Sequence, residues 1–129
     1  MKQTMEQKRA AHAWLSAKGA KDTLNAPNIK DSFRDYVNAA KGLPALIMNS
    51  GLMQVMAYFN GKKEEERYGL LSSHLRDWLH QIHGTPNDFE GFMQRMLSAE
   101  PRDFQAITAE AFAWLRWLRQ MAPAVQKED

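Results

Sequence analysis

The stretch PALIMNSGLMQVMAYFN, residues 44–60, decides the fold class of this chain. Placed on a helix at about 100° per residue, its apolar side chains point in every direction. A helix that is apolar all round is buried on all sides, and Pro44 suits a first helical turn, where its missing N–H costs nothing. We therefore predict one helix over 44–60 at the centre of the protein. Its methionines are interpreted as flexible core filling, with a binding surface as the alternative.

The rest of the chain predicts further helices packed around this one. β-branched residues are few, with three Val, four Ile and four Thr against seventeen Ala, twelve Leu and eight Met, a balance typical of helices and not of strands. Lys41-Gly42 and Gly84-Thr85-Pro86-Asn87 interrupt the helical spacing. Apolar periodicity and capping signals place the other helices at residues 4–18, 29–40, 65–83, 88–98 and 101–121.

Length and composition indicate one domain. The 129 residues are enough to bury a core without disulfides, and the absence of Cys excludes disulfides, thiolate metal sites and Cys nucleophiles. We predict an all-α fold, a compact single-domain bundle of about six helices around a central apolar helix. The domain spans 1–129, with the charged first few residues and the tail 123–129 expected to be flexible.

Neither export nor membrane insertion is expected. The first residues, MKQTMEQKRAAHAWL, carry charges where a signal peptide needs an apolar run. The apolar stretch 43–59 is shorter than the roughly 20 residues of a membrane span and is interrupted by polar residues. We expect a cytoplasmic protein that does not contact a membrane.

The charge of the chain is unevenly distributed along the sequence. Its net charge is only +2, which by itself does not indicate a nucleic-acid-binding protein. Residues 1–63 carry ten basic and four acidic side chains, whereas residues 64–129 carry seven basic and eleven acidic ones. Either one half presents a basic face, or the folded surface mixes the two signs.

No catalytic signature is present. The seven glycines form no phosphate-binding loop, and neither a G-x-S-x-G nor an H-E-x-x-H motif occurs. The consecutive carboxylates of residues 64–66 splay around a helix instead of converging. Asp77, His80 and His83 are spaced so that two or three of them can meet a metal, but further ligands are missing. We predict a protein that is not an enzyme, with no cofactor, metal or small-molecule substrate.

Two segments resemble a known family. KGLPALIMNSGL, residues 41–52, resembles the K-x-L-P-x-x-I-x-x-N-G-L signature of the small helical subunit of type III-B (Cmr) CRISPR effector complexes, although its N-S-G-L step is one residue longer. TAEAFAWLRWLR, residues 108–119, is similar to the family's closing T-x-E-A-L-x-x-L-x-W-L-[KR] pattern. The opening EQKRAA of residues 6–11 and the middle section from Tyr68 to Leu79 also resemble the family. Residues 21–28 and 84–102 match no pattern.

The resemblance implies a structural subunit that is not an enzyme. In that family, copies of a compact helical protein stack beside the backbone subunits that hold the guide RNA. The implied partners are therefore the Cmr backbone subunits, further copies of the chain, the crRNA and the target RNA. The subunit touches the RNA backbone and leaves sequence choice to base pairing, and the opposite charges of the two halves suit head-to-tail stacking.

The family patterns do not fix the contact residues, so we choose them by chemical type and expected exposure. Trp117 lies off the apolar stripe of the last helix, so we assign it and Arg116 to protein–protein contact. The expected phosphate contacts are Arg9, Lys18, Lys41, Lys62, Lys63 and Arg76.

Two other classes of function stay open. A helical protein–protein adaptor without nucleic-acid contact is compatible with the small net charge. A helix-turn-helix regulator needs a short polar recognition helix after a tight turn, and the apolar helix predicted after Gly42 is unsuited to that role. A preference for single-stranded or hybrid RNA over duplex DNA would separate these classes.

Overall fold

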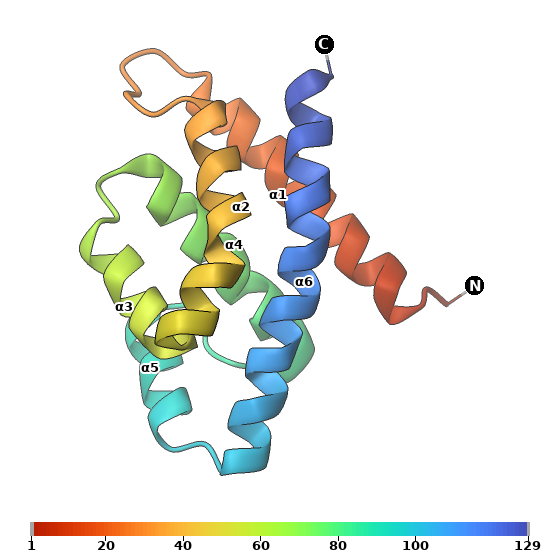
Figure 1. Ribbon diagram of the computed structural model, residues 1–129, viewed down its shortest axis with the longest axis vertical. Helices are drawn as coiled ribbons and strands as arrows, with labels where there is room; N and C mark the ends of the chain where they lie inside the picture. Colours follow the sequence, from red (N-terminus) through yellow and green to blue (C-terminus); the bar gives the residue numbers. More distant parts are fainter. Residues whose placement is uncertain (1, 129) are drawn as a thin grey trace.

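The computed structural model describes residues 2–128, and within them it contains six helices and no strand (Figure 1). The all-α class and the number of helices are therefore confirmed. None of the helices in the described part of the chain combines the length and apolar character needed to cross a membrane. The helices are α1 (Met5–Leu24), α2 (Phe33–Ser50), α3 (Leu52–Gly61), α4 (Glu66–His83), α5 (Phe89–Leu97) and α6 (Pro101–Lys127).

The helix starts follow from local sequence. Thr4 and Ser32 each form a capping box. The hydroxyl accepts a hydrogen bond from the backbone N–H of the third helical residue, and the side chain of that residue accepts one from the backbone N–H of Thr4 or Ser32. Asp88 caps α5 through the N–H of Gly91. Pro101 begins α6, where no N–H is needed.

Two helices organise the packing. The long helix α6 contacts α1, α2 and α4, while α2 contacts α1, α3, α4 and α6. Figure 1 shows α2 between α3 and α6, with α4 behind it. The largest buried side chains come from several helices: Trp78, Trp114, Tyr36, Phe59, Phe92, Leu43, Leu52, Met56, Leu71, Leu75, Leu79 and Met96.

The prediction of a single helix over 44–60 is wrong. The segment belongs to two helices, α2 and α3, which meet at Gly51. Gly51 has φ 86° and ψ 155°, a conformation that side-chain-bearing residues rarely adopt, so the chain turns there. The break predicted at Lys41-Gly42 does not occur, and α2 continues through it and through Pro44. The apolar residues are also not buried all round, since 42% of Leu46 and 76% of Met48 are exposed.

Other predicted helix ends were too early. The helix predicted over 4–18 continues through Gly19 to Leu24, and the last helix passes Pro123 and ends at Lys127 instead of residue 121. Buried apolar side chains explain both extensions: Leu24 is buried at the end of α1, and Val125 is buried near the end of α6. The helices predicted at 65–83 and 88–98 agree with α4 and α5 to within a residue at each end.

The basic and acidic halves of the sequence interleave in the fold. Ion pairs join them between Arg9 and Glu110, between Lys18 and Glu128, and between Asp31 and Arg67. Part of the charge difference between the halves is thus neutralised inside one molecule. These pairs bring charged side chains of the two halves into contact within one molecule.

Candidate nucleic-acid interface

Arg9 lies inside the fold at the junction of three helices. From α1, its Nε and one terminal nitrogen donate to the two carboxylate oxygens of Glu110 on α6 at 2.7 and 2.8 Å. The other terminal nitrogen donates to Glu6 at 2.9 Å. Trp78 on α4 donates its indole N–H to the same Glu110 carboxylate at 3.0 Å. All the guanidinium nitrogens of Arg9 therefore have partners, and we leave Arg9 out of the interface.

The charge state of Glu110 follows from these contacts. Burial alone raises the pKa of this carboxyl, but the hydrogen bonds from Arg9 and Trp78 and the positive charge of Arg9 outweigh it, so the pKa is lowered overall. Glu110 is a buried carboxylate near the start of the family-like segment 108–119, and the sequence pattern does not indicate its partners. Its role is to join α1, α4 and α6.

Arg76 is also held by the fold. Its Nε donates to the backbone carbonyl of Asn87 at 2.6 Å, across the loop between α4 and α5. Burial lowers the pKa of Arg76, and the charge of Asp88 opposes that effect. One of its terminal nitrogens is buried without a hydrogen-bonding partner in the described part of the chain. A phosphate therefore has little access to this guanidinium.

Lys18 is exposed on α1 but already has two partners. Its Nζ lies 3.1 Å from a carboxylate oxygen of Glu128 and 5.4 Å from the ring centroid of Trp14. The neighbouring Lys21 donates to the backbone carbonyls of Val125 and Glu128. These lysines attach the end of α6 to α1.

The lysines at positions 41, 62 and 63 lie on the two arms of the hairpin formed by α2 and α3. Lys41 lies ten residues before Gly51, on α2, and Lys62 and Lys63 directly follow α3. Lys41 and Lys63 are exposed, and neither belongs to an ion pair within residues 2–128. Lys62 lies 3.8 Å from Glu65 and 5.5 Å from the ring centroid of Tyr58. Of the six expected phosphate contacts, these three are the most available.

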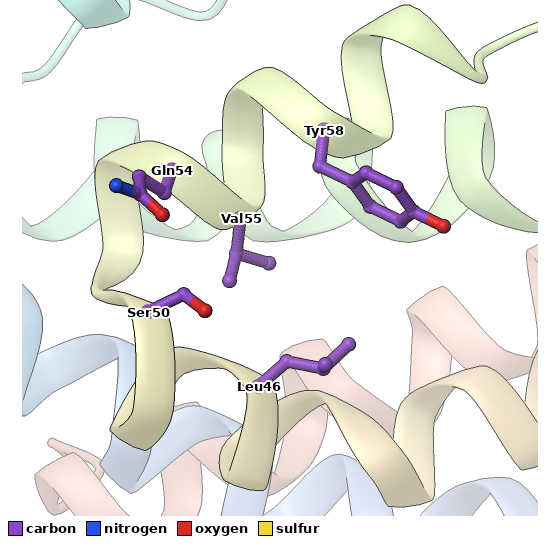
Figure 2. A pocket seen from close by; sticks show the side chains of 5 residues that line it. All are labelled: Leu46, Ser50, Gln54, Val55 and Tyr58. Carbon is purple, nitrogen blue, oxygen red and sulfur yellow. The ribbon is translucent and has the colours of Figure 1, made fainter.

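A small open pocket lies between the two arms, and we call it the α2–α3 notch (Figure 2). Its volume is about 220 Å³. Figure 2 shows Val55 pointing from α3 toward α2, the Ser50 hydroxyl turned toward the same space, and the Tyr58 ring at one end. The lining residues are Leu46, Ser50, Gln54, Val55 and Tyr58. The sequence did not single out Tyr58, because the turn at Gly51 that creates the notch was not predicted.

Trp117, which we predicted to contact another protein, is half-buried on α6. Its indole N–H donates to Glu6 on α1 at 3.1 Å, and its ring packs against the core. Arg116 is exposed beside it. Together with Glu6 and Gln120, these two residues line a shallow surface pocket. The pair is therefore adjacent on the surface, and its contact with another protein stays a prediction.

Two histidines of the sequence, His12 and His80, make hydrogen bonds within the fold. The Trp114 N–H donates to Nδ1 of His12 at 2.9 Å, so His12 carries its proton on Nε2 and donates it to Asp77 at 2.8 Å. His80 contacts the carbonyl of Thr85 through Nδ1. In the described residues, no group of three or more His, Asp or Glu side chains is placed to hold a metal ion.

The comparison with known families agrees with the motifs of the sequence. The family model Cas_Cmr5, described as CRISPR-associated protein, matches residues 5–125. This match extends from the first helix to the last and includes both segments that carry the resemblance. The chain therefore belongs to the Cas_Cmr5 family of CRISPR-associated proteins, the small helical subunit of type III-B Cmr complexes.

Proposed function

We propose that this chain is a non-catalytic structural subunit of an RNA-guided Cmr effector complex in the cytoplasm, where it serves antiviral defence. It stacks beside the subunits that hold the guide and touches the backbone of the guide or target RNA. Family membership supports the place in the complex. The single structural observation that supports RNA contact is the set of available lysines at positions 41, 62 and 63.

The chemistry of this contact is neutralisation of phosphates. Each ammonium group that approaches a phosphate releases condensed counterions, which favours binding and makes it depend on salt. Such contacts carry no sequence information, so recognition is left to base pairing with the guide. A subunit of this kind needs accessible cations, and the candidates are Lys41 on α2 together with Lys62 and Lys63 directly after α3.

The proposed protein partners are the backbone subunits and further copies of this chain. Stacking in a row requires two different faces on each copy, because contacts between unlike faces propagate. Arg116 and Trp117 are the proposed contribution of α6 to one of these faces. The opposite charges of the two sequence halves are a further proposed contribution, reduced by the ion pairs that join the halves within one molecule.

The experiment that tests RNA contact is the salt dependence of target binding by the reconstituted complex. Changing Lys41, Lys62 and Lys63 together to Gln should reduce the slope of log K against log salt by up to about one unit per lost contact. The measurement is equilibrium binding of labelled target RNA at several salt concentrations. It also needs a check that the complex assembles with the variant subunit.

A matched control removes the same charge from another surface. Arg102, Arg119 and Lys127 are exposed on α6, and changing all three to Gln also removes three positive charges. This control should leave the slope unchanged. Equal slopes for the wild type and the hairpin variant would remove the lysines from the interface.

The alternative is a helical adaptor that touches only protein. Exposed apolar side chains favour it, among them Leu15 with 68% and Leu97 with 73% of the residue exposed. For an adaptor, the hairpin variant would assemble normally and would bind RNA with the wild-type slope. The same experiment therefore separates the two functions.

A further inference from the structure

We propose that the α2–α3 notch binds one unpaired nucleobase of the RNA, stacked against Tyr58, with the adjoining phosphates next to Lys62 and Lys63. This inference rests on the proposed function and makes it more specific. It adds to the contact with phosphates a pocket that takes a base.

The notch offers groups suited to a flat ligand with polar edges. The side chains of Leu46 and Val55 form apolar walls, and 53% of Tyr58 is exposed. Ser50 and Gln54 add a hydroxyl and an amide, both exposed to solvent. A nucleobase has π faces for the phenol ring and an edge of donors and acceptors for Ser50 and Gln54.

The position of Tyr58 is fixed by its neighbours. Its ring lies 6.2 Å from the ring of Tyr68 on α4 in an edge-to-face arrangement and 6.0 Å from the ring of Phe59. Phe59 is buried and contacts Tyr68 in turn, with ring centroids 4.8 Å apart. Tyr58 therefore contacts one core ring and one partly buried ring, while half of its own surface stays exposed. A stacking platform requires this combination of rigidity and exposure.

Charge identifies the occupant. None of the five residues that line the notch is acidic. The ammonium group of Lys62 lies 5.5 Å from the Tyr58 ring centroid and 3.8 Å from the partly exposed Glu65, and Lys63 follows it, exposed and outside any ion pair among residues 2–128. An apolar side chain of a partner protein fills the same space but brings nothing for these cations. A nucleotide fills the notch with its base and brings a phosphate for the lysines.

The first test is photo-crosslinking in the intact complex. Target RNA carrying 4-thiouridine in place of uridine is bound to the reconstituted Cmr complex and irradiated, and crosslinked peptides of this chain are identified by mass spectrometry. The expected peptide contains residues 50–58. Crosslinks on this chain that avoid residues 44–63 would overturn the base pocket and leave RNA contact in place. No crosslink to this chain, where other subunits crosslink, would overturn both.

The second test separates stacking from charge. Tyr58→Ala should weaken target binding by a factor between about 5 and about 150, the range for loss of one stacked base. Tyr58→Phe keeps the aromatic face and should bind like the wild type. Neither change removes a charge, so the salt slope should stay the same, unlike that of Lys62→Gln. Wild-type affinity of the Tyr58→Ala complex would overturn the inference.

A control addresses folding. Tyr58 is exposed by half, so its removal should leave the melting temperature of the subunit nearly unchanged. Leu97→Ala removes another exposed apolar side chain, on α5, and should not affect RNA binding. Equal losses for Tyr58→Ala and Leu97→Ala would also contradict the base pocket.

Discussion

At the scale of single residues, the carboxylate of Glu110 decides how three helices meet. It accepts hydrogen bonds from Arg9 on α1 and from Trp78 on α4, and 8% of the residue is exposed. Removing one member of a buried ion pair leaves the other charge without compensation. The stability of the fold around this junction therefore depends on both Arg9 and Glu110.

Glu110→Ala should lower the free energy of unfolding by about 3 kcal/mol, because it leaves two guanidinium nitrogens of Arg9 and the Trp78 N–H without their acceptor. The measurement is urea unfolding of the purified subunit. Glu6 is the matched control, since it also pairs with Arg9 but has a side chain that is 64% exposed. Glu6→Ala should cost less than about 1 kcal/mol. Similar decreases in the free energy of unfolding for the two variants would show that the buried pair contributes no more to stability than the exposed one.

His74 predicts how stability depends on pH. Burial lowers its pKa to about 4, and the neighbouring His12 adds to this effect while Asp77 opposes it. Tyr36 is buried, which raises its pKa, so its hydroxyl keeps its proton and shares a hydrogen bond with Nδ1 of His74 at 2.9 Å. Both groups are therefore neutral in the folded protein.

The unfolded chain binds a proton at His74 more readily than the folded one, so stability is lost as pH falls from about 6.5 to about 4. The loss attributable to His74 is at most about 3 kcal/mol. The free energy of unfolding should thus decrease over this range in the wild type. In His74→Gln, which has no imidazole at this position, the free energy of unfolding should change less between pH 6.5 and 4.5. Parallel profiles for the two proteins would refute this assignment.

The sequence shows charge but not pairing. Arg9 is predicted as a phosphate contact from its chemical type and expected exposure, yet its partner Glu110 is 101 positions away. Lys41 and Lys63 were chosen by the same argument, and they are exposed. Nothing local distinguishes Arg9 from these lysines, because the distinction depends on which helices the fold brings together.

At the scale of helices, Gly51 determines the shape of the α2–α3 hairpin. It ends α2 by donating its N–H to the carbonyl of Ile47 at 2.7 Å, and its own carbonyl accepts the N–H of Val55 at 3.2 Å. A Cβ at this position would meet no other atom within 4 Å. The need for glycine is therefore a matter of backbone conformation alone.

Gly51→Ala should lower the free energy of unfolding by about 1 to 3 kcal/mol, the cost of an unfavourable φ and ψ. Gly19 is the matched control, because it lies in the interior of α1 with open space around it. Gly19→Ala should stabilise by up to about 1 kcal/mol. Thermal unfolding by circular dichroism measures both changes, and a neutral Gly51→Ala would mean that the turn tolerates a side chain.

Helix boundaries were predictable where local signals are strong. Gly84, with φ 70°, ends α4 where the sequence placed its end, and Pro101 begins α6 as predicted. Around the apolar run 44–60 the signal is ambiguous, because Gly42 precedes the run and Gly51 lies within it. Packing decides between them: Leu43 and Ile47 are buried on one helix face, which carries α2 past Gly42 to Gly51.

At the scale of the whole molecule, the fold class and the family were accessible from sequence because both depend on patterns spread over the chain. Composition and helical periodicity indicated an all-α bundle, and the two motifs indicated the family. Surfaces were not accessible in this way. The notch and the junction at Glu110 each combine residues whose proximity depends on the packing of complete helices.

Assembly into the complex is predicted to depend on the surface around Arg116. This residue is exposed next to Trp117 in a shallow pocket, so Arg116→Glu should reduce incorporation of the subunit into the complex roughly 5-fold or more. Arg119→Glu, also exposed on α6, is the control for charge reversal. Co-purification with the backbone subunits measures incorporation, and equal yields for the two variants would move the protein contact elsewhere.

The contacts between Lys21 on α1 and the end of α6 have a consequence for synthesis of the protein on the ribosome. Lys21 on α1 binds backbone carbonyls near the end of α6, and Val125 at that end is buried. Because a nascent chain emerges from its N-terminus onward, the core face of α1 has no α6 to cover it until residues 101–127 have been translated. We therefore expect this subunit to complete its folding only after α6 has been translated. Chains interrupted before α6 are expected to leave apolar surface of α1 exposed to proteases.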